Sequence, residues 1–465
     1  MNCESKNFSV QAPVKVQSLY VWSILACIAI GWGGVLFGRF QYDDFPNILN
    51  DPATALGPLL WERLAHGIRP LSRLSYAIDF ALWGNAPRAW FMTNLSLHVV
   101  TSYGVWRLAR YASVSPVGAW AAALIFALQP AHGSVVAYIS GRSSGLMTAL
   151  LVWALVAYEF GTRNREFHRR ATALALLLFV AACAAKEVAL IFPLLLLLWE
   201  HTKPNRHAVD QTPLQAITPY LLAALAMVPY GISLTRYREL LAYSLHLRTP
   251  IESLIQNLTA LPLTASLLLR PWDLAVEHPL PITSDWVQTL SAATLVACIA
   301  AALVVRRRWP RLTLGLLWPL IALLPTHSFI AKVDVISETP LYLAWVGPAI
   351  ALGVGLSSGS TSFRAERLRY YCVLLGVVVA SALCGWRATV WSDPVYLWRE
   401  AVRSAPQSNR AWNNLGMAHL ADDNVELARA SFLEALRLEP TNTLTQFNLE
   451  LTGLFYPAKN EEERK

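Results

Sequence analysis

The sequence predicts an all-α membrane protein, in which a bundle of about eleven helical spans precedes a short helical repeat region. Three observations support this. Hydrophobic residues make up 55% of the 465-residue chain and charged residues only 15%, whereas soluble proteins carry roughly 25% charged residues. Basic residues form short clusters between long apolar runs, and the composition changes abruptly at Trp391. Lipid must therefore solvate most of the chain, which excludes a cytosolic enzyme, a disordered protein and a fibrous protein.

The net charge of +8 does not indicate nucleic-acid binding. The basic residues lie in the connections between apolar runs, where the positive-inside rule accounts for them. The six cysteines include no C-x-x-C pair, so neither a zinc site nor a disulfide framework is predicted.

The membrane domain is predicted over residues 19–390, after a cytoplasmic tail at 1–18 that carries Lys6 and Lys15. No small-residue cleavage site follows the first apolar run, so we expect a retained span and not a signal peptide. The run at 251–270 is ambiguous, because it contains Glu252 and Asn257 and is interrupted by Pro262. Further apolar runs are centred near residues 100, 123, 152, 178, 193, 225, 296, 320, 348 and 379.

The basic clusters set the expected orientation. They should face the cytoplasm, and they comprise Arg107/Arg110, Arg163/Arg165/Arg169/Arg170, Lys203/Arg206, Arg306–Arg308 and Arg364/Arg367/Arg369. If 251–270 does not span, the non-cytoplasmic side then receives the long loop 38–90, residues 130–142, the Lys186-Glu187 junction, 330–340 and everything after about 390.

Residues 391–456 are predicted to form a tetratricopeptide repeat region. A large residue, a Leu-Gly pair, small residues at a helix crossing and a terminating proline occur at the offsets of that repeat, at Trp412, Leu415, Gly416, Ala428, Phe432, Ala435 and Pro440. Since three repeats are normally needed for an independent array, this short region should lean on the membrane domain or on a partner. A charged tail follows at 457–465.

The adjacent carboxylates Asp43 and Asp44 lie just beyond the first span. Like charges close together raise one pKa, which suits a general base near neutral pH. The alternative is a turn or helix cap before Pro46.

Further charged groups share the predicted outer side: Arg69, His132, Arg142 and the Lys186-Glu187 pair. Cations there suit a lipid-linked phosphate. A Lys-Glu pair at membrane depth indicates function, unless both side chains simply snorkel at an interfacial turn. Asn94 and His98 are one helical turn apart and are expected to be a hydrogen-bonded pair inside the bundle.

These motifs occur in an order that resembles the transmembrane and tetratricopeptide repeat-containing O-mannosyltransferases and their bacterial relatives. The resemblance covers nearly the whole chain and rests on Asp43-Asp44, Arg69-Pro70-Leu71, the Asn94-to-His98 spacing, Pro130 through Arg142, Lys186-Glu187, Leu324-Pro325-Thr326, Glu338 before Leu341-Tyr342-Leu343, and Trp391.

The resemblance implies a GT-C glycosyltransferase fold and an enzyme that uses a sugar on a polyprenyl or dolichyl phosphate. The sugar would pass with inversion to a hydroxyl on the non-cytoplasmic side. Asp43 is implied as the base with Asp44 beside it, and Arg69, His132, Arg142, Lys186, Glu187 and Glu338 as substrate-binding residues. The chain departs from the family pattern at Gly133-Ser134, at Ser143-Ser144 and at Thr339. These departures leave open which sugar is transferred and whether a divalent metal takes part. No metal ligand or other cofactor is assigned.

The leading function is thus a glycosyltransferase in a multi-pass membrane protein, expected in a bacterial inner membrane with its repeats on the periplasmic or lumenal side. Its partners would be the lipid-linked sugar, an acceptor protein or envelope glycan, and membrane lipids. Two alternatives remain open. The first is a lipid-linked glycan transporter, although the sequence shows no inverted repeat of the kind found in many transporters. The second is a non-catalytic scaffold that docks partners on its repeats.

Overall fold

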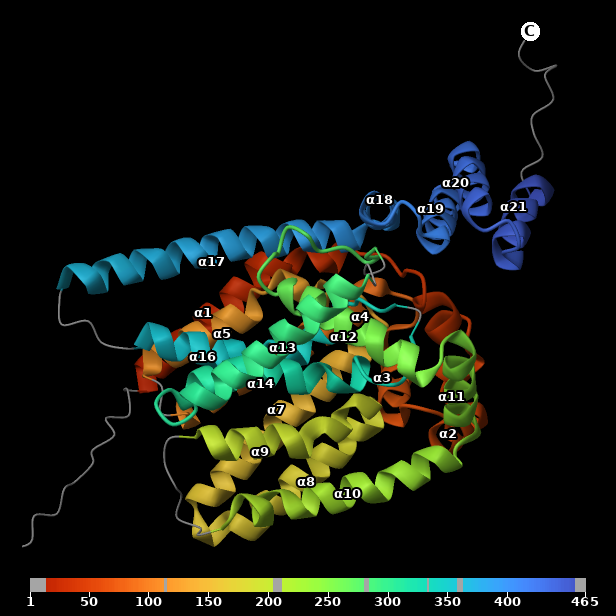
Figure 1. Cartoon of the computed structure of the whole chain (residues 1–465). Coiled ribbons are helices and arrows are strands. Elements are labelled where there is room, and N and C mark those ends of the chain that lie inside the picture. Colours follow the sequence, from red (N-terminus) through yellow and green to blue (C-terminus); the bar gives the residue numbers. More distant parts are fainter. Residues whose placement is uncertain are drawn as a thin grey trace, which may run out of the picture.

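The computed structural model describes residues 14–112, 115–203, 211–279, 284–332, 334–357 and 363–455, and within these ranges it contains helices and turns but no β-strand (Figure 1). The membrane domain is built on the long helices α1 (Val14–Trp32), α4 (Pro87–Tyr111), α5 (Pro116–Ala127), α7 (Arg142–Arg163), α8 (His168–Ala185), α9 (Phe192–Thr202), α10 (Pro213–Ser233), α13 (Asp285–Val305), α14 (Pro310–Leu323), α16 (Val346–Ser357) and α17 (Phe363–Ser392).

The remaining helices and helical turns occupy the connections. The 38–90 loop carries η2 (Phe45–Leu49), η3 (Pro52–Thr54), α2 (Pro58–His66) and α3 (Pro70–Trp83), after η1 (Gly33–Phe37) extends the first span. The other connections hold η4 (Pro130–His132), α6 (Gly133–Val136), η5 (Arg165–Phe167), η6 (Glu187–Ile191), α11 (Thr235–Leu247), α12 (Pro250–Ser266), η7 (Leu324–Thr326) and α15 (Leu341–Ala344).

Proline marks the start of many of these helices. α3, α4, α5, α10 and α14 all begin at a proline, whose fixed φ suits the first helical turn and whose missing N–H is not needed there. At α10 and α12 the preceding threonine adds a reciprocal capping box, with Gln215 and Glu252 respectively. The sequence therefore encodes these boundaries locally.

Small residues let the helices of the bundle approach closely. A Cβ added at Gly353 in α16 would lie 2.5 Å from the carbonyl oxygen of Gly118 in α5, and one added at Gly104 in α4 would lie 2.5 Å from Cγ1 of Val152 in α7. Glycine at such contacts is typical of helix packing in membranes, where van der Waals contact drives association.

Six helices are long and apolar enough to cross a membrane among the residues described, or seven if the bent pair Pro116–Ala127 and Pro130–Val136 counts as one span. The chain is thus an integral multi-pass membrane protein, but the expected number of about eleven spans is not confirmed. α9, α14 and α16 have 11, 14 and 12 residues, and α4 carries Arg88, Asn94, His98 and Arg107.

The ambiguous run at 251–270 forms α12, which is not among the candidate spans. Just before α12, the Arg248 side chain donates to the Lys332 carbonyl, and just after it the Leu268 carbonyl accepts from the Gln129 side chain at 3.2 Å. One end of α12 is therefore tied to the predicted outer loop 330–340, and the other end to Gln129, one residue before the predicted outer segment 130–142.

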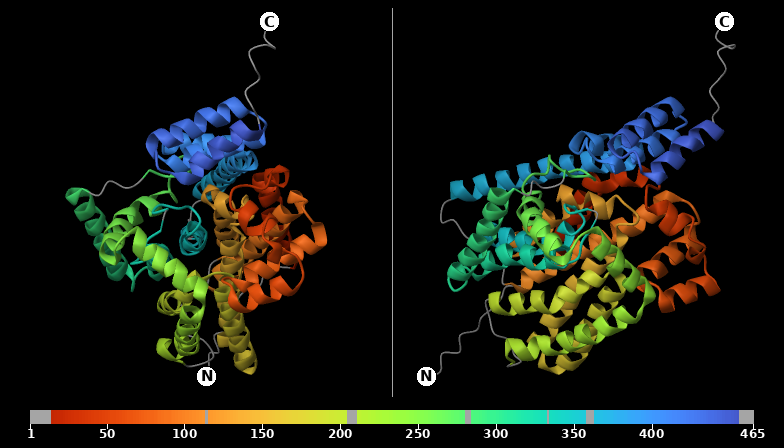
Figure 2. Two further views of the ribbon diagram at one scale, coloured as in Figure 1. Left: turned by 90° about the vertical axis from the view of Figure 1, so that its right-hand side faces the viewer. Right: turned by 45° about the vertical axis from the view of Figure 1, so that its right-hand side comes forward.

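The C-terminal region consists of α18 (Pro394–Ser404), α19 (Asn409–Ala421), α20 (Val425–Leu438) and α21 (Thr443–Phe455), each packed on the next. Gly416 allows the ring of Phe432 to lie where a Cβ would be, within 2.5 Å. In Figure 2 both views place these blue helices on the side of the bundle that carries the red 38–90 loop, and Arg39 pairs with Asp422 at 2.8 Å between the two. The region leans on the membrane domain, while its tetratricopeptide assignment and the 391–456 boundary stay predictions; the tail at 457–465 lies outside the described residues.

Candidate active site

The two adjacent aspartates occupy different environments. Asp44 is 0% exposed; its Oδ1 accepts from the Ser140 N–H at 2.9 Å and the Ser140 hydroxyl at 2.6 Å, and its Oδ2 accepts from the Gln41 N–H at 3.0 Å. Burial raises the pKa of Asp44 to about 6, although these hydrogen bonds oppose the shift. Asp44 thus fastens the start of the 38–90 loop to the 137–142 turn.

Asp43 is the accessible member of the pair. Its side chain is half-buried, and its backbone N–H donates to the Tyr138 hydroxyl at 3.2 Å. Burial raises its pKa, and the charge of Asp334 adds to the increase, while a hydrogen bond with Tyr138 and the charge of Arg410 oppose it. A partly exposed carboxylate with a raised pKa can accept a proton.

Arg69 and Glu187 form a two-pronged ion pair between the 38–90 loop and the start of η6. Arg69 Nε and Nη2 lie 2.9 and 2.6 Å from the two carboxylate oxygens, the geometry of a strong guanidinium–carboxylate contact. Desolvation raises the pKa of Glu187, but the charge and hydrogen bonds of Arg69 outweigh it and bring the pKa down to about 2. Both side chains remain about one-third exposed.

Two ammonium groups lie near this ion pair. Lys186 Nζ donates to the Ser144 hydroxyl at 2.6 Å. Burial and the charge of Arg69 lower the pKa of Lys186 to about 7. Burial likewise lowers the pKa of Lys332 to about 8, while Glu187 and Asp334 oppose that shift. A desolvated ammonium gains most from an anion, so this cluster favours a phosphate.

Arg142 lies elsewhere than expected. It is 0% exposed, and its guanidinium contacts Asp79 at 2.6 Å, the Asn94 side chain at 2.8 Å and the Trp90 carbonyl at 3.0 Å. Protein groups already surround its donors, and the expectation that Arg142 binds substrate stays a prediction. It joins α3, α4 and α7 instead.

His132 and Glu338 are also enclosed. His132 is 0% exposed and packs on the rings of His98, Phe126 and Tyr342, with no hydrogen-bond partner for either ring nitrogen among the described residues. Glu338 is 4% exposed and lies 3.4 Å from Arg387. The structure therefore brings together Asp43, Asp44, Arg69, Lys186 and Glu187, and keeps His132, Arg142 and Glu338 inside the protein.

The expected pairing of Asn94 with His98 is replaced by separate contacts. Asn94 accepts from Arg142, as above, and donates to the Tyr138 carbonyl at 2.9 Å. The two ring nitrogens of His98 lie 2.8 Å from the Tyr342 hydroxyl and 2.9 Å from the Ala127 carbonyl. Both residues join helices of the bundle, as predicted, but through different partners.

Comparison with known proteins identifies the relatives of this chain. It is 22% identical to mouse protein O-mannosyl-transferase TMTC3 over 92% of this chain, and 27% identical to human protein O-mannosyl-transferase TMTC4 over 84%. Drosophila protein O-mannosyl-transferase Tmtc1 is 32% identical over 32% of this chain and 19% of its own length. The homologues of this chain are TMTC-family O-mannosyltransferases. The resemblance predicted from the sequence is confirmed at this level.

The coverage of these relatives is partial. The chain spans about half the length of the curated relatives it matches, 52% of mouse TMTC3 and 62% of human TMTC4. No family model matches it. Among solved structures, the mycobacterial arabinofuranosyltransferase AftD is similar over 88% of this chain and 29% of its own, with 16% identity and a TM-score of 0.41.

Sequence reasoning missed Tyr138, Lys332, Asp334 and Arg410. Lys332 and Asp334 lie in the predicted outer loop 330–340 and Tyr138 in the predicted 130–142 loop, so their sidedness alone could have suggested them. Arg410 is the exception. It lies in the repeat region, and only the packing of that region on the membrane domain brings it near Asp43. In the part of the chain that the structure describes, no three His, Cys, Asp or Glu side chains gather as a metal site.

Proposed function

We propose that this protein is a membrane glycosyltransferase of the GT-C type that uses a polyprenyl-phosphate-linked sugar. The acceptor would be a hydroxyl of a protein or another envelope molecule, and the names of the relatives suggest mannose as the sugar. The observation that carries the proposal is that Asp43, a half-buried carboxylate with a raised pKa, and Lys186, an ammonium with a lowered pKa, both contact the 138–144 segment at one end of the helix bundle.

The segment around Lys332 and Asp334 links the two halves of this site. Asp334 raises the pKa of Asp43, and Lys332 interacts with Glu187 and Arg69. Asp334 therefore connects the base to the cationic cluster, which consists of Arg69, Lys186 and Lys332. An acceptor bound by Asp43 and a phosphate bound by these cations could meet there.

In the proposed reaction, the Asp43 carboxylate takes the proton of the acceptor hydroxyl as its oxygen attacks the anomeric carbon. The bond from that carbon to the phosphate oxygen breaks, and its electron pair leaves with the polyprenyl phosphate. Because attack comes from the opposite face, the configuration inverts. Arg69, Lys186 and Lys332 stabilise the charge that grows on the departing phosphate. Asp44 holds the loop and takes no proton.

The activity is tested by two complementary measurements. Purified protein in lipid nanodiscs should transfer mannose from polyprenyl-phosphate-linked mannose to peptides that contain serine or threonine. The Asp43→Asn variant serves as the inactive control. Mass spectrometry of envelope proteins from wild-type and deletion strains should reveal a lost glycan mass. Unchanged glycan masses together with no transfer in nanodiscs would favour the transporter or the scaffold.

The proposal also places the Asp43 end outside the cytoplasm of a bacterial inner membrane. The basic clusters at Arg306–Arg308 and Arg364–Arg369 leave one crossing, α17, before Trp391. A phosphatase fused after Arg403 should then be active, and a fluorescent protein that folds only in the cytoplasm should be dark. The reverse pattern would place the repeats and Asp43 on the cytoplasmic side.

A further inference from the structure

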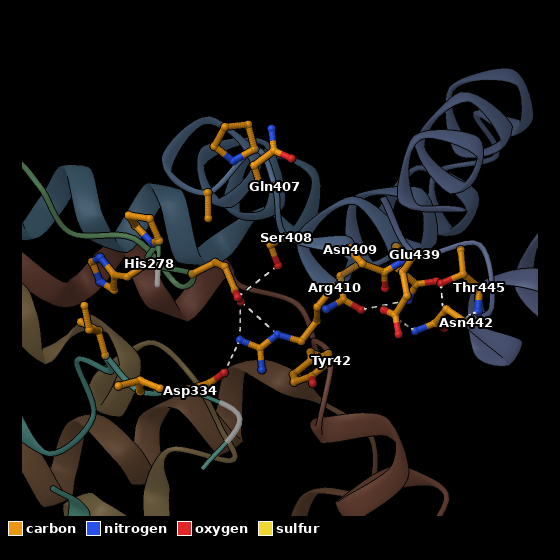
Figure 3. A pocket seen from close by; sticks show the side chains of 18 of the residues that line it. Tyr42, His278, Asp334, Gln407, Ser408, Asn409, Arg410, Glu439, Asn442 and Thr445 are labelled. Atoms are coloured by element: carbon orange, nitrogen blue, oxygen red, sulfur yellow. Dashed lines mark hydrogen bonds and ion pairs between the residues drawn. The ribbon is translucent and has the colours of Figure 1, made fainter. Parts of the chain in front are cut away.

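A pocket of about 720 Å³ lies between the membrane domain and the repeat region, immediately beside the proposed base. The membrane domain contributes Tyr42, the 277–279 segment and the 334–336 segment. The repeat region contributes the α18–α19 turn, α19 and the α20–α21 turn (Figure 3). Since Tyr42 precedes Asp43 in the chain, a molecule in this pocket reaches the edge of the candidate active site.

Arg410 fixes the two walls relative to each other. From α19 it contacts Asp334 at 2.5 Å and Glu277, to which its Nε donates at 2.9 Å, and Figure 3 shows it reaching across the pocket toward Asp334. The Ser408 hydroxyl donates to Glu277 at 3.1 Å. The pocket wall is therefore held by several charge-assisted contacts and not by one flexible side chain.

The pocket carries an excess of negative charge. Three carboxylates, Glu277, Asp334 and Glu439, and one guanidinium, that of Arg410, line the described wall, which gives a formal net charge of −2 with His278 counted as neutral. Arg410 pairs with Glu277 and Asp334, so Glu439 is the carboxylate without a cationic partner in the wall. Glu439 is exposed and accepts from the Asn442 side chain at 3.1 Å. A ligand that brings a positive charge would be attracted and oriented by this field.

An amide in the wall offers a second, independent indication. Asn414 is 7% exposed, and its Nδ2 has no hydrogen-bond partner in the described residues. Its neighbour Asn413 is held by Asn448, which donates to it at 2.9 Å. A buried unpaired donor is costly unless something supplies an acceptor, and a peptide carbonyl in the pocket could supply it after a small shift of the side chain.

We propose that this pocket binds the acceptor as an extended polypeptide segment with lysine or arginine close to the hydroxyl residue. This rests on the proposed function and deepens it by naming the acceptor class. A peptide supplies the cation for the three carboxylates, a carbonyl for Asn414 and apolar side chains for Pro279, Ile336 and Leu444. A neutral envelope glycan supplies no cation, and Tyr42 is the one phenol or indole ring in the described wall on which its C–H face could stack.

The test measures peptide binding without donor, so that it does not depend on transfer. Fluorescent peptides with one serine flanked by lysine, glutamine or glutamate are titrated against the full-length protein in nanodiscs. Lysine-flanked peptides should bind most tightly and glutamate-flanked ones least. Glu439→Gln should weaken lysine-peptide binding roughly 2- to 5-fold, and Asn414→Leu should weaken all peptides roughly 2- to 10-fold.

Glu426→Gln provides the matched control, because Glu426 is exposed on α20 and does not line the pocket; it should leave binding unchanged. Equal affinity for the three peptides, or an effect of Glu426→Gln equal to that of Glu439→Gln, would overturn the proposal. So would binding of a neutral envelope glycan that excludes the peptides. Charge-dependent peptide binding without sugar transfer would instead contradict the proposed function while leaving the pocket assignment intact.

Discussion

Two groups of charged residues lie toward opposite ends of the bundle and differ in how completely they are enclosed. The Asp43 end comprises Asp43, Arg69, Lys186, Glu187 and Lys332. The Glu159 end comprises the charged residues Glu159, Arg163, Glu200 and Lys203 together with the Trp199 indole, near the other terminus of α7. The comparison separates charges that hold the fold from charges that are available to a ligand.

At the Glu159 end the carboxylates are closed in. Glu159 is fully buried, accepts from the Trp199 indole at 2.7 Å and lies 3.3 Å from Arg163. Glu200 accepts from the Tyr158 hydroxyl at 2.8 Å and contacts Lys203. At the Asp43 end, Arg69 and Glu187 remain about one-third exposed, and desolvation shifts the pKa values of Asp43 and Lys186 toward neutrality. A buried network with internal partners is structural, whereas incompletely enclosed groups with shifted pKa values are typical of active sites.

The largest expected effect concerns Asp43. Asp43→Asn keeps the shape of the side chain but cannot accept a proton, so the transfer rate should fall roughly 10²- to 10⁴-fold. Donor binding and membrane expression should change little. Steady-state transfer assays of Asp43→Asn and Asp44→Asn, made side by side, decide the assignment. If Asp43 only caps a turn, asparagine is a comparable cap and activity would stay near wild type.

Substitutions at the Glu159 end should lower the stability of the folded protein and leave donor binding unchanged. Glu159→Ala leaves the buried Trp199 indole without its acceptor, and a buried donor that loses its partner typically costs about 1–3 kcal/mol. Arg163 also loses an acceptor, but it is partly exposed, so water can replace that contact. Thermal unfolding in detergent should reveal the loss, and the surviving folded fraction should retain its donor affinity. Glu434→Ala, in an exposed pair with Arg437, should change unfolding little. A loss of donor affinity in folded Glu159→Ala protein would contradict the division between the two ends.

Lys186 should affect donor binding. Lys186→Met removes one charge-assisted hydrogen bond at a shielded site, so the affinity for the polyprenyl-phosphate sugar should fall roughly 10- to 150-fold while the protein stays folded. Titration of a donor analogue against wild-type and variant nanodiscs measures it. Unchanged affinity would support a side chain that merely snorkels to the interface.

The pH dependence gives the smallest and most diagnostic change. Asp43 works as a carboxylate, so kcat/KM should fall as the pH falls through its raised pKa, above the ordinary aspartate value of 3.8. Lys186 works as an ammonium, so kcat/KM should also fall as the pH rises through its lowered pKa of about 7. Lys186→Arg keeps the charge and should move only the alkaline limb to higher pH. An alkaline limb that is the same in both proteins would remove Lys186 from the donor site.

Local patterns in the sequence located half of the candidate site. Asp43, Arg69 and the Lys186-Glu187 pair were predicted on one side of the membrane from basic clusters and apolar runs, and the structure brings them to one end. The basis is physical: apolar length fixes where a helix can lie, and positive charge fixes which end faces the cytoplasm. Proline and threonine also fixed several helix starts, because their effects on the first turn are local.

Which charged groups remain accessible was decided by the tertiary structure alone. Arg69 and Arg142 look equivalent in the sequence, yet Asp79 and Asn94 enclose Arg142, while Arg69 stays open beside Glu187. In the same way, Asp44 is buried by Ser140 from a distant loop, and Arg410 meets Asp334 only because the repeat region packs on the membrane domain. Burial and pairing are set by contacts between residues far apart in the chain, and so they determine which of several similar side chains keeps a free face for a substrate.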